Sequence, residues 1–187
     1  MNFKLILTGL TIVAATAVSA QENRFSAGLE LGLPMGDFGD ATSFGIGGSL
    51  GYEIPVGDNL GVIAQAGFMS FSGKDQDLGL VSIEGVNYTM IPVQVGAKYY
   101  FTDNQEGFYA MGLLGIHSMS FKSPEYEFLG VKYGGETVSD TNLSFAPGLG
   151  YIVGENIDLA LRYQIISGDG GSSSYLGIRA AFMFGSR

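Results

Sequence analysis

The stretch IDLALRYQII, residues 157–166, alternates between two kinds of side chain. One parity carries only large apolar or aromatic residues, and the other carries an arginine, Arg162, near its centre. Residues two apart share one face of a β-strand, so the alternation predicts a strand with one apolar face and one partly polar face. The fold depends on which face points inward.

Seven other segments show a similar alternation. They are FSAGLELGL (25–33), SFGIGGSLGYE (43–53), LGVIAQAGF (60–68), NYTMIPVQVGAKYYF (87–101), GFYAMGLLGIHSMSF (107–121), NLSFAPGLGYIV (142–153) and SYLGIRAAFMF (174–184). The facing of 107–121 stays open, because both of its parities are largely apolar. No window has a helical period, so we predict an all-β chain of eight strands.

The amino-acid composition indicates which face of the strands points inward. Only 14% of the 187 residues are charged and 46% are hydrophobic, whereas soluble domains carry about 25% charged residues. The less apolar face is mostly glycine, alanine and serine, which would make a poor water-facing surface. In a membrane β-barrel the apolar face meets lipid and the other face lines the lumen. We therefore predict an eight-stranded antiparallel up-and-down transmembrane β-barrel, whose lumen has room for little beyond side chains.

The connections support this prediction. The first, third, fifth and seventh are richer in glycine and polar residues, and the other three are tight. Membrane barrels have long extracellular loops and short periplasmic turns, so the first kind is expected to face outward. Two aromatic girdles are also expected. The short-turn set is Tyr52, Tyr99, Phe101, Tyr151, Phe182 and Phe184, and the long-loop set is Phe44, Phe68, Phe121, Phe145 and Tyr175.

The first 20 residues predict export. They place Lys4 before an apolar run that ends in small residues, which is typical of a secretory signal peptide. We expect cleavage between Ala20 and Gln21, a barrel domain over 21–187, and a location in the outer membrane.

Polar residues on the inward parity predict a network in the lumen. Closure of the barrel would bring the strand with Glu30 beside the last strand, which carries Arg179 and neighbours the strand with Arg162. Residue counting puts all three near mid-height, with Gln94 and Asp158 nearby. Such groups need partners inside a narrow lumen.

Several motifs resemble one family. LGLPMGDFGD, GYEIPVGDN, IPVQVGAKYYF, APGLGYIVGENIDLALRYQ and YLGIRAAFMF are similar to the outer-membrane β-barrel domain family of the eight-stranded OmpA/OmpX-like type, with a Bacteroidetes flavour. The resemblance implies contact with outer-membrane lipid and insertion by the barrel-assembly machinery, guided by a C-terminal aromatic signal. Phe182 and Phe184 match that signal, although residues 185–187 follow them.

The sequence offers little chemistry. An acidic chain of net charge −9 without basic clusters argues against a nucleic-acid partner, and no cysteine is present. Some barrels of the resembled type modify lipid A with histidine and serine, but Ser118 beside the only histidine, His117, points to the opposite strand face. We therefore expect no catalytic, metal or cofactor site.

The expected function is structural, or a surface interaction through acidic loops at Asp75, Asp77, Glu125, Glu127 and Glu136, without general porin activity. Two alternatives stay open. One is a lipid A deacylase-like enzyme that uses His117, and the other is a soluble periplasmic lipocalin-like binder of an apolar ligand.

Overall fold

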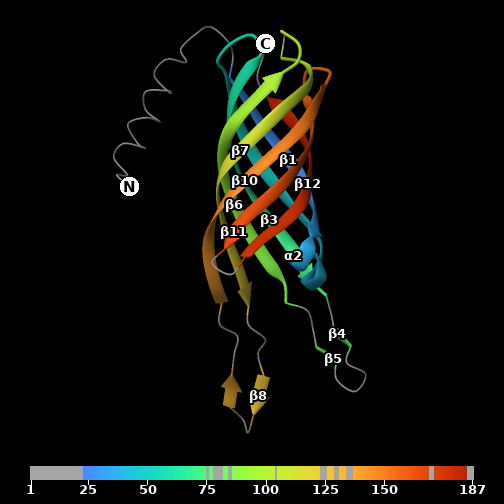
Figure 1. Cartoon of the computed structure of the whole chain (residues 1–187), viewed down its shortest axis with the longest axis vertical. Coiled ribbons are helices and arrows are strands. Elements are labelled where there is room, and N and C mark those ends of the chain that lie inside the picture. The colour runs from blue at the N-terminus through green and yellow to red at the C-terminus, as the bar shows by residue number, and fades with distance from the viewer. Residues whose placement is uncertain are drawn as a thin grey trace, which may run out of the picture.

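Eight long strands close into an antiparallel barrel (Figure 1). The computed structural model describes residues 23–74, 76–77, 82–83, 86–103, 105–122, 126–128, 131–133, 137–168 and 171–184. The barrel strands are β1 (Arg24–Met35), β2 (Thr42–Pro55), β3 (Leu60–Gly73), β6 (Tyr88–Tyr100), β7 (Gly107–Lys122), β10 (Thr137–Val153), β11 (Ile157–Gly168) and β12 (Gly171–Phe184). Each pairs with the next barrel strand along the chain, and β1 closes the wall against β12. The predicted up-and-down barrel is confirmed.

The two ends of the barrel differ (Figure 1). One, here called the short-turn end, holds the turns at 56–59 and 154–156 and the turn residues 101–103 and 105–106. The other, the long-connection end, holds helix α2 (Gly36–Ala41) and two small hairpins. These hairpins are β4 (Gln76–Asp77) with β5 (Ser82–Ile83), and β8 (Tyr126–Phe128) with β9 (Val131–Tyr133). The predicted signal peptide and the Ala20–Gln21 cleavage site lie outside the described residues.

The sequence shows no helical period at α2 because the helix has only six residues, fewer than two turns. Among the described residues, no helix is long and apolar enough to cross a bilayer.

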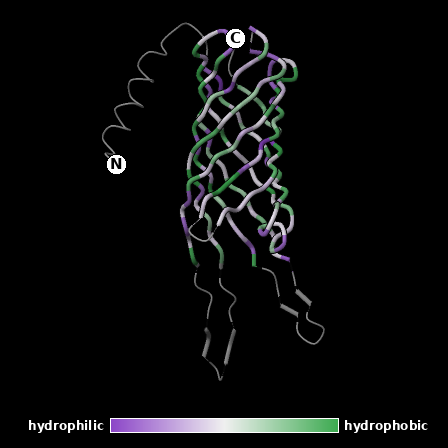
Figure 2. Tube along the Cα trace, in the orientation of Figure 1, coloured by the Kyte–Doolittle hydropathy of each residue, from purple (hydrophilic) through white to green (hydrophobic). Residues whose placement is uncertain are grey.

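The apolar face of the strands points outward. On β11, Leu159 and Leu161 are 43% and 47% exposed, whereas Arg162 is 2% exposed. Hydrophobic positions recur along the whole wall, interleaved with less hydrophobic ones (Figure 2). The soluble lipocalin-like alternative does not fit this arrangement, because it needs the apolar face inside.

The structure also settles the facing of β7. Leu113 is fully buried and its neighbour Leu114 is 61% exposed, so the odd-numbered residues of this strand line the lumen. Sequence alone could not separate the two, because a lipid-facing leucine and a lumen-filling leucine look alike.

Apolar side chains fill the lumen near both ends. A cluster here called the plug lies toward the long connections and consists of Phe38, Met69, Phe71, Met90, Ile166 and Tyr175. Phe38 comes from α2, which turns this side chain inward against Phe71 with 5.2 Å between ring centroids. A second cluster consists of Tyr100, Tyr109, Met111, Ile152, Ala160 and Met183. Beyond its polar network, the lumen is thus more apolar than the sequence suggested.

At the short-turn end the expected rings lie close to one another or to further rings. Ring centroids lie 4.9 Å apart for Phe182–Phe184 and 5.9 Å apart for Tyr99–Phe101. Tyr52 and Tyr151 each lie 4.6 Å from a ring that the sequence prediction did not include, Phe25 and Phe108 respectively.

The girdle expected at the long-connection end is only partly correct. Phe44, Phe68 and Phe145 face outward, but Tyr175 is fully buried in the plug. Phe121 shares the lumen-side parity of β7 and contacts Tyr88. The assignment of Tyr175 was wrong because it used height on the strand without parity, whereas Phe121 is 36% exposed.

Candidate functional site

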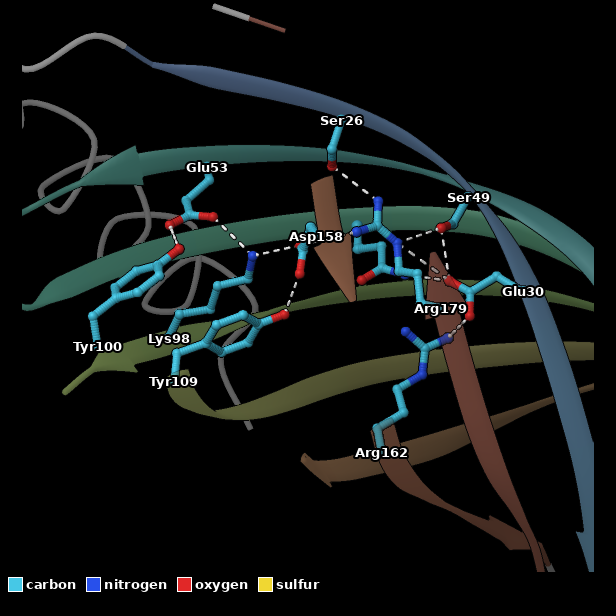
Figure 3. A network of polar contacts seen from close by, with 11 residues as sticks. Ser26, Glu30, Ser49, Glu53, Lys98, Tyr100, Tyr109, Asp158, Arg162 and Arg179 are labelled. Atoms are coloured by element: carbon cyan, nitrogen blue, oxygen red, sulfur yellow. Dashed lines mark hydrogen bonds and ion pairs between the residues drawn. The ribbon is translucent and has the colours of Figure 1, made fainter. Parts of the chain in front are cut away.

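The barrel encloses a balanced set of charges. Among the described residues, the buried charged side chains are three carboxylates and three cations, namely Glu30, Glu53, Asp158, Lys98, Arg162 and Arg179. They come from β1, β2, β6, β11 and β12, so opposite walls of the barrel contribute (Figure 3). Charges so deeply buried persist only when they are paired.

Glu30 is the centre of one half of this network. Its Oε2 lies 3.1 Å from Nη2 of Arg162, and its Oε1 lies 3.5 Å from Nε of Arg179. The same Oε1 accepts hydrogen bonds from Ser49 Oγ at 2.7 Å and from Gln65 Nε2 at 2.9 Å. Both carboxylate oxygens are therefore bonded to charged or polar donors.

Lys98 is the centre of the other half. Its Nζ lies 2.9 Å from Asp158 Oδ2 and 3.0 Å from Glu53 Oε2. Two tyrosine hydroxyls add hydrogen bonds to these carboxylates. Tyr100 donates to Glu53, and Tyr109 donates to Asp158.

Arg179 joins the two halves. Its Nη1 lies 3.2 Å from Asp158 Oδ2, while its Nε donates to Ser49 Oγ at 2.9 Å on the Glu30 side. Nη2 donates to Ser26 Oγ at 2.9 Å. One guanidinium thus bonds to side chains on β1, β2 and β11 (Figure 3).

The family model described as outer membrane protein beta-barrel domain matches residues 5–184. The chain belongs to this family. Family membership places the protein in the outer membrane, with its apolar wall in lipid. No curated protein is a recognisable sequence relative.

Solved structures share the fold of this outer-membrane barrel at low identity. The attachment invasion locus protein Ail of Yersinia pestis is 17% identical with a TM-score of 0.59, over 87% of this chain and 98% of Ail. The N-terminal barrel domain of Pseudomonas aeruginosa OprF is 15% identical with a TM-score of 0.52, over 88% and 100% of the two chains. Neisserial surface protein A is 13% identical with a TM-score of 0.51, over 87% and 97%. Such identities show a common fold and nothing finer.

Of the five lumen residues named from sequence, the structure of this outer-membrane barrel brings four into one network. Glu30, Arg162, Arg179 and Asp158 are linked directly or through Arg179. Gln94 is also buried in the lumen, but its Nε2 donates to Ser144 Oγ at 3.2 Å.

Apart from Asp158, sequence reasoning missed the Lys98 half of the network. Glu53, Lys98 and Tyr100 all stand on the inward parity of their strands, so alternation alone marks them as lumen residues. What alternation lacks is the register between strands, which decides that these side chains meet at one height.

Glycines in the barrel wall leave space for the network. A Cβ at position 61 would lie 2.5 Å from Glu53 Oε1, and a Cβ at Gly150 would lie 2.1 Å from Tyr109 Cζ. The lumen glycines therefore make room for the long polar side chains of facing strands.

His117 has no serine beside it. Its Nε2 lies 3.3 Å from Tyr175 Oη inside the lumen, whereas Ser118 points outward and accepts a hydrogen bond from Thr141 Oγ1 at 3.3 Å. No group of three or more metal-ligating side chains occurs in the part of the chain that the structure describes. The lumen arrangement can cross-link the wall, and Ser118 is not placed to pair with His117.

Proposed function

We propose that this protein is a closed, non-enzymatic barrel of the outer membrane that supports the envelope and presents its long connections for surface interaction. Support comes first from the lumen, where the charge network and the plug lie between the two ends. A general porin keeps a water-filled channel, which needs more strands than eight.

The long-connection end is proposed to face the cell exterior. β1 begins at Arg24 and β12 ends at Phe184, and these two strand ends lie at the short-turn end of the barrel (Figure 1). An exported chain threaded from the periplasm leaves these ends on the periplasmic side. We also propose that cleavage after Ala20 precedes insertion by the barrel-assembly machinery, which would use the outward-facing Phe182 and Phe184.

The surface partner is proposed to be uncharged or basic. The connection at 123–136 contains Glu125, Glu127 and Glu136 against one base, Lys132. One structure of Ail holds a heparin analogue, sucrose octasulfate. A polyanion of that kind is not the expected ligand here, because the acidic connection would repel it.

Conductance tests the closed lumen. Purified protein in a planar bilayer should show no sustained channel of porin size, and vesicles carrying it should exclude small sugars. A general porin measured in the same bilayer is the positive control, which shows that the assay detects an open channel. Sugar uptake by the unaltered protein would contradict the proposal.

Shortening one connection tests the surface role. Lys122 pairs with Thr137 across β7 and β10, so an Asn-Gly turn can replace 123–136 without disturbing the hairpin register. The shortened protein should insert normally, as shown by different gel migration of unheated and boiled samples, yet lose surface binding. Unchanged surface binding and unchanged envelope integrity would overturn the surface role.

The lipid-modifying alternative is not favoured, because His117 contacts a tyrosine in the lumen and lacks a serine partner. Cells carrying His117→Ala should keep the lipid A profile of cells with the unaltered protein. Loss of a lipid A species in the variant alone would establish the enzyme instead.

A further inference from the structure

The outward face changes chemistry toward the long connections on six consecutive strands of the barrel. Along each strand the last apolar residue is followed, two positions further out, by serine or threonine. We call these six residues the hydroxyl rim: Ser70 on β3, Thr89 on β6, Ser118 on β7, Thr141 on β10, Ser167 on β11 and Ser174 on β12. None of them is buried.

Strand pairing makes the rim continuous. Ser70 stands opposite Thr89, and Ser118 stands opposite Thr141. At the other junctions, going round the wall from β3 to β12, each rim residue lies two positions nearer the short-turn end than the residue paired with the previous rim residue. For example, Ser167 on β11 pairs with Ser172, and the rim residue of β12 is Ser174, two positions nearer the short-turn end. Barrel strands are tilted relative to the barrel axis, so residues at one height shift in a constant direction along successive strands. The offsets between rim residues all have the same direction, as residues at one height should.

The apolar residues below the rim are the wall that faces lipid. Phe68, Ile91, Ile116 and Leu143 are 43–72% exposed on the outward face. The rim therefore borders the hydrocarbon directly, with no intervening polar residue on the outward parity.

The rim differs from the opposite boundary of the same wall. At the short-turn end the boundary consists of touching aromatic pairs, which suit a phospholipid interface. The six rim residues themselves carry neither a ring nor a charge, although the outward-facing rings of Phe68, Phe145 and Tyr163 lie on the short-turn side of the rim. A band exposed to bulk water normally includes charged residues, and a band in hydrocarbon would leave hydroxyls poorly satisfied.

Some rim hydroxyls are already held in place from within the wall. Thr141 Oγ1 donates to Ser118 Oγ at 3.3 Å, and Tyr163 Oη donates to Ser174 Oγ at 3.1 Å. A hydroxyl oxygen has two lone pairs as well as one proton, so each of these serines keeps capacity for a further hydrogen bond.

From these observations we propose that the hydroxyl rim is the surface at which the barrel hydrogen-bonds the polar headgroups of the surrounding lipid leaflet. The rim would then set the depth of the barrel on its long-connection side. This goes beyond the proposed function, which concerns the lumen and the connections.

Tryptophan depth measurement tests the proposal, because the chain contains no tryptophan. Ser118→Trp reports the rim, and Leu114→Trp reports the same face of β7 about 13 Å deeper along the strand. Each variant is folded into phosphatidylcholine vesicles with bromine near the headgroup or near the chain end. The rim tryptophan should be quenched more by shallow bromine, and the control tryptophan more by deep bromine.

Two results would overturn the proposal. Stronger quenching of the rim tryptophan by deep bromine would place the rim in hydrocarbon. Water-like emission without quenching by either lipid would place it outside the membrane.

A second measurement avoids the bulky probe. Thr89→Val with Thr141→Val extends the apolar wall without changing side-chain shape, so the yield of folded barrel should shift toward thicker bilayers. Thr137→Val, an exposed position beyond the rim on β10, is the matched control and should cause no shift. Equal behaviour of the double variant and the control would contradict a rim at the headgroups.

Discussion

Arg162 and Glu30 stand 132 residues apart in the chain, yet their side chains meet in the lumen with 3.1 Å between Nη2 and Oε2. The contact forms because β1 and β11 both border β12 in the closed barrel. Each partner is at most 2% exposed, so water cannot replace either one.

Replacing Glu30 with glutamine should therefore be costly. Arg162 and Arg179 would keep their charges but lose a carboxylate partner, and removal of one member of a buried pair typically costs about 3–5 kcal/mol. The free energy of unfolding in lipid vesicles, from urea titration, measures the loss. Glu155→Gln at an exposed turn is the matched control and should change it by less than about 0.5 kcal/mol.

The Glu30–Arg162 contact predicts coupling between substitutions. A cycle of Glu30→Gln, Arg162→Gln and the double variant should give an interaction energy of roughly 0.5–3 kcal/mol. Glu30→Gln combined with Phe108→Ala on the lipid face should be additive. Additivity in the first cycle would count against the contact.

Gly150 should tolerate no larger residue. An added Cβ would overlap the Tyr109 ring, so Gly150→Ala should destabilise the barrel by about 1–3 kcal/mol and weaken the Tyr109–Asp158 bond. Gly112 on β7 is the control, because a Cβ there meets nothing within 4 Å. If the overlap is the cause, Tyr109→Leu should abolish most of the penalty of Gly150→Ala.

The short helix α2 should depend on one side chain. Phe38 is 8% exposed and contacts Phe71 and Tyr88, so Phe38→Ala removes the anchor of the helix in the plug. Amides of 36–41 should exchange with deuterium much faster in the variant, while those of β1 and β2 keep their protection. Asp40→Ala, exposed in the same helix, should leave exchange nearly unchanged.

The closed wall predicts a gel shift. All eight barrel strands are hydrogen-bonded on both sides, so the folded protein should resist detergent at room temperature and unfold on boiling. Unheated and boiled samples should then migrate differently. Identical migration of the two samples would argue against a folded barrel in the extracted protein.

The alternation of side chains could be taken from sequence because it is a local property. The period of two decides that Arg162, Glu30 and Arg179 share the lumen face, and the low charge content decides that this face is inside. The same pattern marks Glu53 and Lys98 as inward, without saying which residues they meet. On β7 the pattern fails, because Leu113 and Leu114 are equally apolar.

Residue counting placed Glu30, Arg162 and Arg179 near one height, but the other contacts inside the lumen were decided by the tertiary structure. They depend on the stagger between strands and on the closure of β1 against β12, which bring residues of β2, β6 and β11 to one height. The side chains of a single strand do not indicate how that strand is staggered against its neighbours. The sequence therefore determined which residues face lipid and which face the lumen, and the closed sheet decided that Lys98 meets Glu53 and Asp158, and that Phe38 folds back into the plug.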